Sequence, residues 1–270
     1  MGTYDPDIED FKTAVSSIQN QSYRNWEFLI VDDGSEAEIY QKIKAVCKED
    51  PRIRLFHLKA NKGLAHALNF GIKKAKGTYI ARMDDDDVSL PERLKKEVEF
   101  LEKNEKYDWV GCGADLFDKM GIWGSTSRPK EPDRYSFLHS SPFIHPSVLF
   151  RRKMIADCGG YNEGLFASRC EDYELFMRLY ACGSRGYNIQ EVLFQYREDS
   201  KKLHRSMKYC FYEMQIRRKG FSAMKILSWK TFPFVFKPLA VGIASFCPQI
   251  SQKLRIKKNK GDWSIEKKKQ

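Results

Sequence analysis

The sequence predicts an α/β fold of the Rossmann-like type, in which helices flank a mainly parallel sheet. Apolar segments of strand length alternate with amphipathic segments through the first 110 residues. This alternation is typical of parallel strands joined by right-handed helical crossovers. Two of the apolar segments run directly into clusters of aspartates, and ligands bind at the carboxyl ends of such strands. The chain has 270 residues, enough for one large domain and an appendage.

Each expected element follows from its local pattern. Apolar residues at three- and four-residue spacing predict helices, and Asp7 is the expected N-cap of the first one. Short runs rich in β-branched and aromatic residues predict buried strands. The expected helices cover residues 8–18, 36–48, 64–74, 91–101 and 171–182, and the expected strands cover residues 26–31, 53–57, 78–83 and 147–150.

The charge of the chain is unevenly distributed. The net charge is +11, but residues 201–270 hold 18 basic and 3 acidic residues, whereas residues 1–200 hold 29 basic and 33 acidic ones. We therefore expect a domain over residues 1–200 and a helical, basic and aromatic tail over residues 201–270. A basic tail favours a polyanionic partner, either nucleic acid or an anionic membrane surface.

The cysteines and the N-terminus indicate a cytoplasmic protein. The seven cysteines are odd in number and have no metal-ligand spacing, which argues against a disulfide scaffold and against a zinc site. The N-terminus has no signal-peptide pattern. The most apolar stretch, residues 231–250, is interrupted by Lys237 and three prolines, so it is a poor membrane-spanning helix.

Two aspartate clusters are expected at one edge of the sheet. Asp32 and Asp33 end one strand, and the run from Asp84 to Asp87 ends another. Adjacent carboxylates raise one another's pKa, so a cation is needed to neutralise them. Their oxygen ligands favour a hard divalent cation, Mg²⁺ or Mn²⁺. Two other interpretations stay open: a solvated acidic loop at the run of four, and simple capping of the next helix by Asp32 and Asp33.

Six motifs, taken in order, resemble those of the family-2 inverting glycosyltransferases, which have the GT-A fold. The resemblance covers about residues 1–200 and depends on the order and spacing of all six motifs, since each one alone is weak. The motifs are Val31-Asp32-Asp33-Gly34-Ser35, Asn61-Lys62-Gly63-Leu64-Ala65 with Asn69, Met83-Asp84-Asp85-Asp86-Asp87 followed by Leu90-Pro91-Glu92-Arg93-Leu94, His145-Pro146-Ser147, Gly159-Gly160-Tyr161, and Glu171-Asp172-Tyr173-Glu174-Leu175.

The resemblance implies a role for each matching residue. Asp172 would be the general base. Asp86 would be the direct ligand of Mg²⁺ or Mn²⁺, and Asp84, the other end of the DxD pair, would contact the ribose or a metal-bound water. The residues implied to bind the nucleotide of a UDP-sugar are Thr3 and Tyr4 near the base and ribose, Asp33 at the uracil ring, Asn61, Lys62 and Gly63 beside the nucleotide, and Asp84 and Asp85 in the DxD run.

The expected chemistry favours sugar transfer over hydrolysis. A nucleotide-sugar carries its own diphosphate leaving group, so one carboxylate suffices as the base for the acceptor hydroxyl. A glycoside hydrolase needs two carboxylates that flank the scissile bond. A nucleotidyltransferase would have a glycine- and lysine-rich triphosphate loop near the N-terminus, and this sequence has none. A catalytically weak GT-A protein that binds a nucleotide-sugar as a sensor or scaffold stays open as the alternative.

The tail suggests the kind of acceptor. Aromatic residues occur between basic ones from residue 209 to 236, and a basic cluster follows at 253–260. This pattern is typical of an interfacial helix drawn to anionic lipid, and no nucleic-acid-binding module is recognisable. We expect a peripheral protein at the inner face of the cell membrane, acting on a saccharide or polyprenyl-linked acceptor in cell-surface polysaccharide synthesis. A helical cap with a solvated charged end is the alternative.

The first strand departs from the family pattern. Family members have several apolar residues before the segment that matches Met1 to Asp5, so we expect either a start further upstream or a very short first strand. A short strand would weaken the support beneath Thr3 and Tyr4. His145 is expected either as a packed loop histidine or as a ligand contact. Four arginines are expected at the surface rather than at phosphates: Arg128, Arg151, Arg152 and Arg169.

Overall fold

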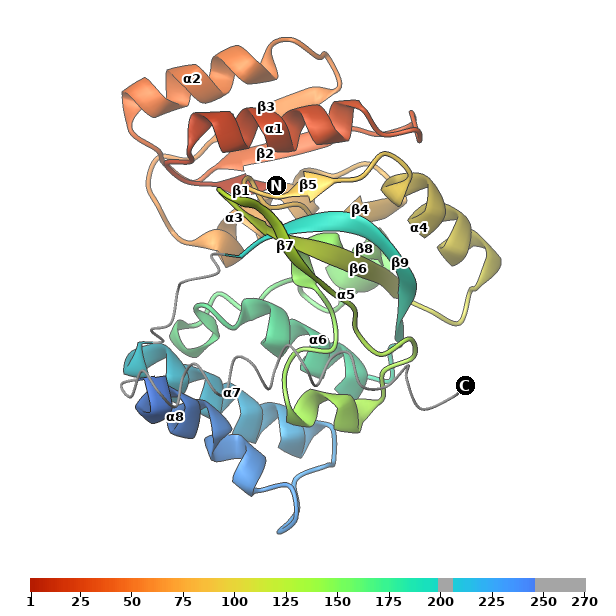
Figure 1. Ribbon diagram of the computed structural model, residues 1–270, viewed down its shortest axis with the longest axis vertical. Helices are drawn as coiled ribbons and strands as arrows, with labels where there is room; N and C mark the ends of the chain where they lie inside the picture. The colour runs from red at the N-terminus through yellow and green to blue at the C-terminus, as the bar shows by residue number, and fades with distance from the viewer. Residues whose placement is uncertain (199–205, 246–270) are drawn as a thin grey trace.

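The computed structural model describes residues 1–198 and 206–245. The first 75 residues lie at one end of the molecule, a twisted sheet crosses its middle, and the helices of residues 206–245 lie at the other end (Figure 1). Strands and helices alternate along the first half of the chain, so the predicted α/β fold class is confirmed.

The first sheet consists of three parallel strands. The buried central strand β2 (Phe28–Asp32) pairs on one side with β1 (Gly2–Thr3) and on the other with β3 (Ile53–His57). Thr3, Asp32 and His57 stand in register at the carboxyl edge, so side chains that follow β1 and β2 meet there. Three helices complete this part of the chain: α1 (Ile8–Gln19), α2 (Ala37–Cys47) and α3 (Leu64–Lys74).

Helix α1 begins where the sequence predicts. The carboxylate of Asp7 accepts hydrogen bonds from the backbone N–H groups of Glu9 at 3.0 Å and Asp10 at 3.4 Å. Such a cap contributes about 1 kcal/mol to helix stability. The apolar residues Phe11 and Val15 then face the core. Capping and periodicity together therefore fix this element from local sequence.

The second sheet is mixed rather than parallel. At its centre, β6 (Trp109–Asp118) runs parallel to β9 (Gly186–Arg197) and antiparallel to both β7 (Gly121–Thr126) and β8 (Leu149–Arg151). The sequence pattern did not predict β6, β7 or β9. The remaining elements around this sheet are β4 (Tyr79–Ala81), which pairs with β8, β5 (Val88–Ser89), which pairs with β9, and the helices α4 (Arg93–Lys103) and α5 (Arg152–Asp157).

Strand β1 has only two residues in this sequence, Gly2–Thr3. On the side that faces β1, strand β4 has no partner among the described strands, because it pairs only with β8. A pocket of about 770 Å³ lies between β2 and β4, and its lining includes Leu29, Leu68 and Ile80. Strand pairing that supports Thr3 therefore comes from only two residues of β1, Gly2 opposite Val31 and Thr3 opposite Asp32.

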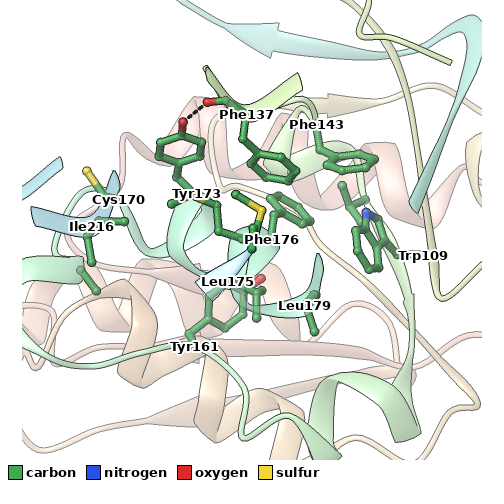
Figure 2. Close-up of a cluster of buried hydrophobic side chains, with 14 of the residues drawn as sticks. Trp109, Phe137, Phe143, Tyr161, Cys170, Tyr173, Leu175, Phe176, Leu179 and Ile216 are labelled. Carbon is green, nitrogen blue, oxygen red and sulfur yellow. Dashed lines mark hydrogen bonds between the residues drawn. The ribbon is translucent and has the colours of Figure 1, made fainter. Parts of the chain in front are cut away.

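The largest apolar core lies around helix α6 (Glu171–Ala181). Figure 2 shows Phe176 of this helix packed among Trp109 and Phe143, with Tyr161 nearby. The hydroxyl of Tyr173 donates a hydrogen bond to the carbonyl of Phe137. These contacts fix the buried face of α6, and so they fix the position of its first turn.

Two further helices complete this core, α7 (Met207–Ala223) and α8 (Pro233–Ser245). Ile216 and Phe221 from α7 and Val235 from α8 are buried in it. The described part of the tail is helical, as predicted, and it packs on the domain as the cap alternative expects. Residues 246–270, with the basic cluster, lie outside the described residues. No helix within residues 1–198 and 206–245 is both long and apolar enough to cross a membrane.

Candidate active site

Asp32 and Asp33 do not cap the helix that follows them. The buried carboxylate of Asp32 accepts a hydrogen bond from the hydroxyl of Ser35 and contacts Nδ1 of His57 at 2.5 Å. The carboxylate of Asp33 accepts hydrogen bonds from the backbone N–H groups of Lys62 at 3.0 Å and Gly63 at 2.7 Å. Helix α2 starts without a side-chain cap. The capping interpretation is therefore wrong, and Asp33 instead holds the loop at 61–63.

Gly34 permits this close approach of the loop. Its φ is 85°, and a Cβ on it would lie 2.7 Å from the carbonyl carbon of Ala60. Both the backbone conformation and the space therefore require glycine. The turn after β2 brings the predicted nucleotide residues Asn61, Lys62 and Gly63 to Asp33.

The four aspartates of the run lie between β4 and β5, and they have different partners. The hydroxyl of Thr3 donates a hydrogen bond to Asp85 at 2.5 Å. Asp84 forms an ion pair with Arg82. In the part of the chain that the structure describes, no ion pair or hydrogen bond from another residue holds the carboxylate of Asp86. The predicted metal ligand is thus the least engaged member of the run.

The electrostatics of this run favour a bound cation. Burial raises the pKa of Asp86 to about 6, and the charges of Asp84 and Asp85 add to this effect. Burial also raises the pKa of Asp85 and that of Asp87. One oxygen of Asp87, Oδ2, is buried without a hydrogen-bond partner. Carboxylates crowded in this way are costly unless a positive charge joins them.

The carboxylates of the run could hold Mg²⁺ or Mn²⁺ if water and phosphate oxygens complete the coordination shell. Among the described residues, no three His, Cys, Asp or Glu side chains converge to form a complete metal site. Mg²⁺ usually takes one or two carboxylates from the protein and completes its shell with water and substrate phosphates. Asp84 and Asp86 suit that arrangement, because a diphosphate would supply the remaining oxygens.

Arg82, which the sequence pattern did not single out, lies at the centre of the site. It is 4% exposed, and Arg93 donates a hydrogen bond to its backbone carbonyl at 3.0 Å. Burial raises the pKa of Asp87 and of Asp172, and the positive charge of Arg82 partly offsets this effect at both. Arg82 therefore lies close enough to act on both acidic groups.

Arg197, at the end of β9, is a second residue that the sequence pattern missed. Its backbone N–H donates a hydrogen bond to Asp87 at 2.8 Å, and its Nε donates to the backbone carbonyl of Asp86 at 3.0 Å. Its guanidinium also pairs with Asp10 of α1 at 2.5 Å. Arg197 thereby joins the aspartate run to β9 and to helix α1.

Asp172, the predicted base, lies in the first turn of α6. Burial raises its pKa to about 7, and the charge of Glu171 contributes as well. Burial also raises the pKa of Glu171. A carboxylate whose pKa lies near neutrality can accept a proton from a hydroxyl group and release it afterwards.

The aspartate run and Asp172 lie near the same two tyrosine side chains. Burial raises the pKa of the Tyr161 hydroxyl above its usual range, and the charges of both Asp172 and Asp84 add to this effect. The same two carboxylates, together with Asp87, act on the buried hydroxyl of Tyr196. Two groups of carboxylates that are distant in sequence therefore lie near the same two tyrosines.

His145 is a packed histidine. Its Nε2 contacts the hydroxyl of Tyr161 at 2.7 Å, and burial lowers its pKa well below the usual value. Asn69 holds the backbone of Tyr161 through hydrogen bonds of 2.9 Å and 2.7 Å. The structure therefore favours the packing interpretation: His145 contacts Tyr161, and the nearby charge of Arg82 also lowers its pKa.

The other predicted residues separate into two kinds. Tyr4 follows β1 and is 49% exposed, so it is free to meet a ligand. Arg151 and Arg152 are structural: they donate to the backbone carbonyls of Leu101 at 2.7 Å and Gly77 at 2.6 Å respectively. Arg152 is exposed, as predicted, and Arg151 is half-buried.

The mixed α/β fold, with acidic clusters at the carboxyl ends of its strands, is the GT-A fold. The chain belongs to glycosyl transferase family 2, whose model matches residues 3–159. Asp172 lies beyond the matched segment.

Two relatives and one solved structure illustrate the similarity. The chain is 39% identical over 193 residues to EpsE of Bacillus subtilis (strain 168), which is named as a glycosyltransferase. The alignment covers 71% of this chain and 69% of EpsE. It is 31% identical over 210 residues to the UDP-Gal:alpha-D-GlcNAc-diphosphoundecaprenol beta-1,3-galactosyltransferase of Escherichia coli, covering 75% and 74% of the two chains. The mannosyltransferase PcManGT from Pyrobaculum calidifontis, in complex with GDP-Man and Mn²⁺, superimposes with a TM-score of 0.63 at 18% identity, over 94% and 77% of the two chains. This last likeness supports the fold alone.

Proposed function

We propose that the protein is an inverting glycosyltransferase that transfers a sugar from a UDP-sugar to a lipid-linked saccharide in cell-surface polysaccharide synthesis. The observation that carries the proposal is the convergence of the aspartate run and Asp172 on Tyr161 and Tyr196. The donor assignment draws support from the relative named for UDP-Gal, and the acceptor assignment from the diphosphoundecaprenol in the same name.

The chain's own residues divide the work of the reaction. The loop at 61–63, held by Asp33, and Thr3 with Tyr4 bind the nucleotide. Asp172 accepts the proton of the acceptor hydroxyl, because its pKa of about 7 leaves a large fraction ionised at neutral pH. The acceptor oxygen bonds to the anomeric carbon as the bond to the diphosphate oxygen breaks, so the configuration inverts.

Asp86 and Asp84 would hold Mg²⁺ or Mn²⁺. A divalent cation, when bound, stabilises the negative charge of a diphosphate leaving group. Arg82 orients Asp84 through its ion pair, and Thr3 orients Asp85 through its hydrogen bond. Both contacts hold the side chains before the substrate arrives, which lowers the cost of binding.

A pair of substitutions tests the proposal. Asp86→Ala is expected to abolish transfer and to weaken Mn²⁺-dependent UDP binding strongly, whereas Asp172→Asn is expected to abolish transfer and leave UDP binding intact. Asp157→Asn, an exposed carboxylate on α5, is the matched control and should change neither property. Full activity in both site variants would refute the assignment. UDP binding without turnover in the wild-type protein would instead identify a nucleotide-sugar binding or scaffold protein.

We also propose that the tail holds the protein at an anionic membrane surface, on the cytoplasmic side. Trp229 is 82% exposed beside Lys230, and Phe232, directly before α8, and Phe236 within α8 are exposed as well. Aromatic side chains flanked by lysines suit the interface of an anionic bilayer. Removal of residues 246–270, which leaves the core helices in place, is expected to weaken binding to phosphatidylglycerol vesicles. Unchanged binding would refute the role of that segment.

A further inference from the structure

An exposed apolar patch lies on the segment that leads into α6. Leu165 is 65% exposed, Phe166 is 39% exposed, and Phe211 of α7 is 43% exposed. The ring of Phe166 lies 6.4 Å from that of Phe211 and 5.4 Å from that of Tyr212. These side chains therefore form a single surface, and a contiguous apolar surface of this kind commonly marks a binding site.

Three cations border this patch. Lys219 lies 5.9 Å from the ring of Phe166, and Lys208 and Arg169 each lie 6.0 Å from the ring of Tyr209. Within the described residues, none of these three side chains has an ion-pair partner. The surface is thus apolar at its centre and positively charged at its border, which suits a ligand with both a hydrocarbon part and an anionic part.

The patch lies beside Asp172, the predicted general base. Arg169 comes three residues before Asp172, and its charge acts directly on Glu171. Arg169 also has a φ of 64°, a backbone conformation that favours glycine. The short helix Leu165–Ala167 packs on α7, and α6, α7 and α8 stack on the side of the molecule away from β1 to β3 (Figure 1). The patch therefore lies near Asp172, and not near the residues that are predicted to bind the nucleotide.

We propose that this surface, defined by Leu165, Phe166, Phe211, Arg169 and Lys208, binds the prenyl diphosphate portion of the acceptor. Arg169 and Lys208 pair with the diphosphate, and the apolar side chains contact the first isoprene units. The terminal saccharide then extends toward Asp172. The inference rests on the proposed function, because it takes the acceptor to be lipid-linked. In such an acceptor the anionic diphosphate lies between the sugar and the hydrocarbon. On the protein, the cations Arg169 and Lys208 lie between Asp172 and the apolar side chains, so the two arrangements match.

Farnesyl diphosphate is the probe that tests the inference. Its binding would be measured by calorimetry on the full chain, with UDP and Mn²⁺ at saturation so that the nucleotide site is occupied. Arg169→Gly removes the cation while suiting the positive φ, and Leu165→Ser removes an exposed apolar group without touching the core. Tyr135→Ser is the matched control, because this ring is 49% exposed and lies beside Arg134, but belongs neither to the patch nor to the residues assigned to the site.

We expect the wild-type protein and Tyr135→Ser to bind the probe equally, Arg169→Gly to bind at least tenfold more weakly, and Leu165→Ser about threefold more weakly. Equal binding by all four proteins would overturn the inference. So would a parallel loss of binding to phosphatidylglycerol vesicles in the two patch variants, because the surface would then be a general membrane contact. Failure of UDP to bind would refute the proposed function; UDP binding without probe binding would refute the patch alone.

Discussion

Asp172 should reduce the stability of the protein above neutral pH. Its pKa rises from 3.8 to about 7 in the folded chain, chiefly because the carboxylate loses water on burial. At about 1.4 kcal/mol for each pKa unit, the ionised side chain costs the folded state about 4 kcal/mol. Water that reaches the half-buried site reduces this cost, so we expect about 2–4 kcal/mol.

The sign of this effect follows from proton linkage. Between pH 4 and pH 7 the folded state binds more protons at Asp172 than the unfolded state does, so stability falls as the pH rises through this window. The substitution Asp172→Asn replaces the carboxylate with a neutral group of the same shape. The variant should therefore be more stable than the wild type at pH 8 by about 2–4 kcal/mol, and this difference should fall to about 1–2 kcal/mol at pH 5.

Urea unfolding at both pH values measures this difference. The control Asp157→Asn alters an exposed carboxylate and should shift stability by less than about 0.5 kcal/mol at either pH. Asp172→Asn is also expected to lose transfer activity, so this one substitution should raise stability at pH 8 and abolish activity. If Asp172→Asn is no more stable than the wild type at pH 8, the carboxylate is not held in a desolvated site and the reasoning fails.

Three further predictions concern the parts that hold the site. Thr3→Val removes the hydrogen bond to Asp85 while keeping the shape, so it should lower transfer and cost about 1–2 kcal/mol in urea unfolding, whereas Thr3→Ser should restore both. Gly160→Ala should cost about 3 kcal/mol or more in the same assay, because φ is 68° and the new Cβ would lie 2.3 Å from Oδ1 of Asn69. An apolar five-residue extension before Met1 should raise the melting temperature by lengthening β1 into the pocket between β2 and β4, whereas an equally long Gly-Ser extension should not.

The first sheet could be predicted from the sequence because its signals are local. Residues 53–57 form the strand that was predicted there, and Asp7 caps the helix as expected. Strands β6 and β9 could not be predicted in the same way. Gly111 and Gly113 in β6 lower its strand propensity, yet they are needed because a Cβ on them would lie 2.8 Å from Asn188 and 3.0 Å from Glu191. That close packing depends on the partner strand, and local sequence does not contain it.

The candidate site divides in a similar manner. Consecutive aspartates after an apolar run are visible in the sequence, and so is the acidic pair at the start of α6. Arg82 and Arg197 are not, because an arginine within or after a strand looks like any surface cation. Their importance appears only when the fold buries Arg82 between two acidic groups and sets the backbone of Arg197 against Asp87.

The central claim is that the aspartate run and Asp172 form a metal-dependent nucleotide-sugar site. The most direct measurement is a panel of UDP-sugars tested with the wild-type protein for binding and slow hydrolysis, with Mn²⁺ and with EDTA. We predict that at least one UDP-sugar binds and is slowly hydrolysed with Mn²⁺, that EDTA abolishes both, and that the released sugar has the inverted anomeric configuration. Absence of binding by every UDP-sugar in the presence of Mn²⁺, or binding that EDTA leaves unchanged, would contradict the claim.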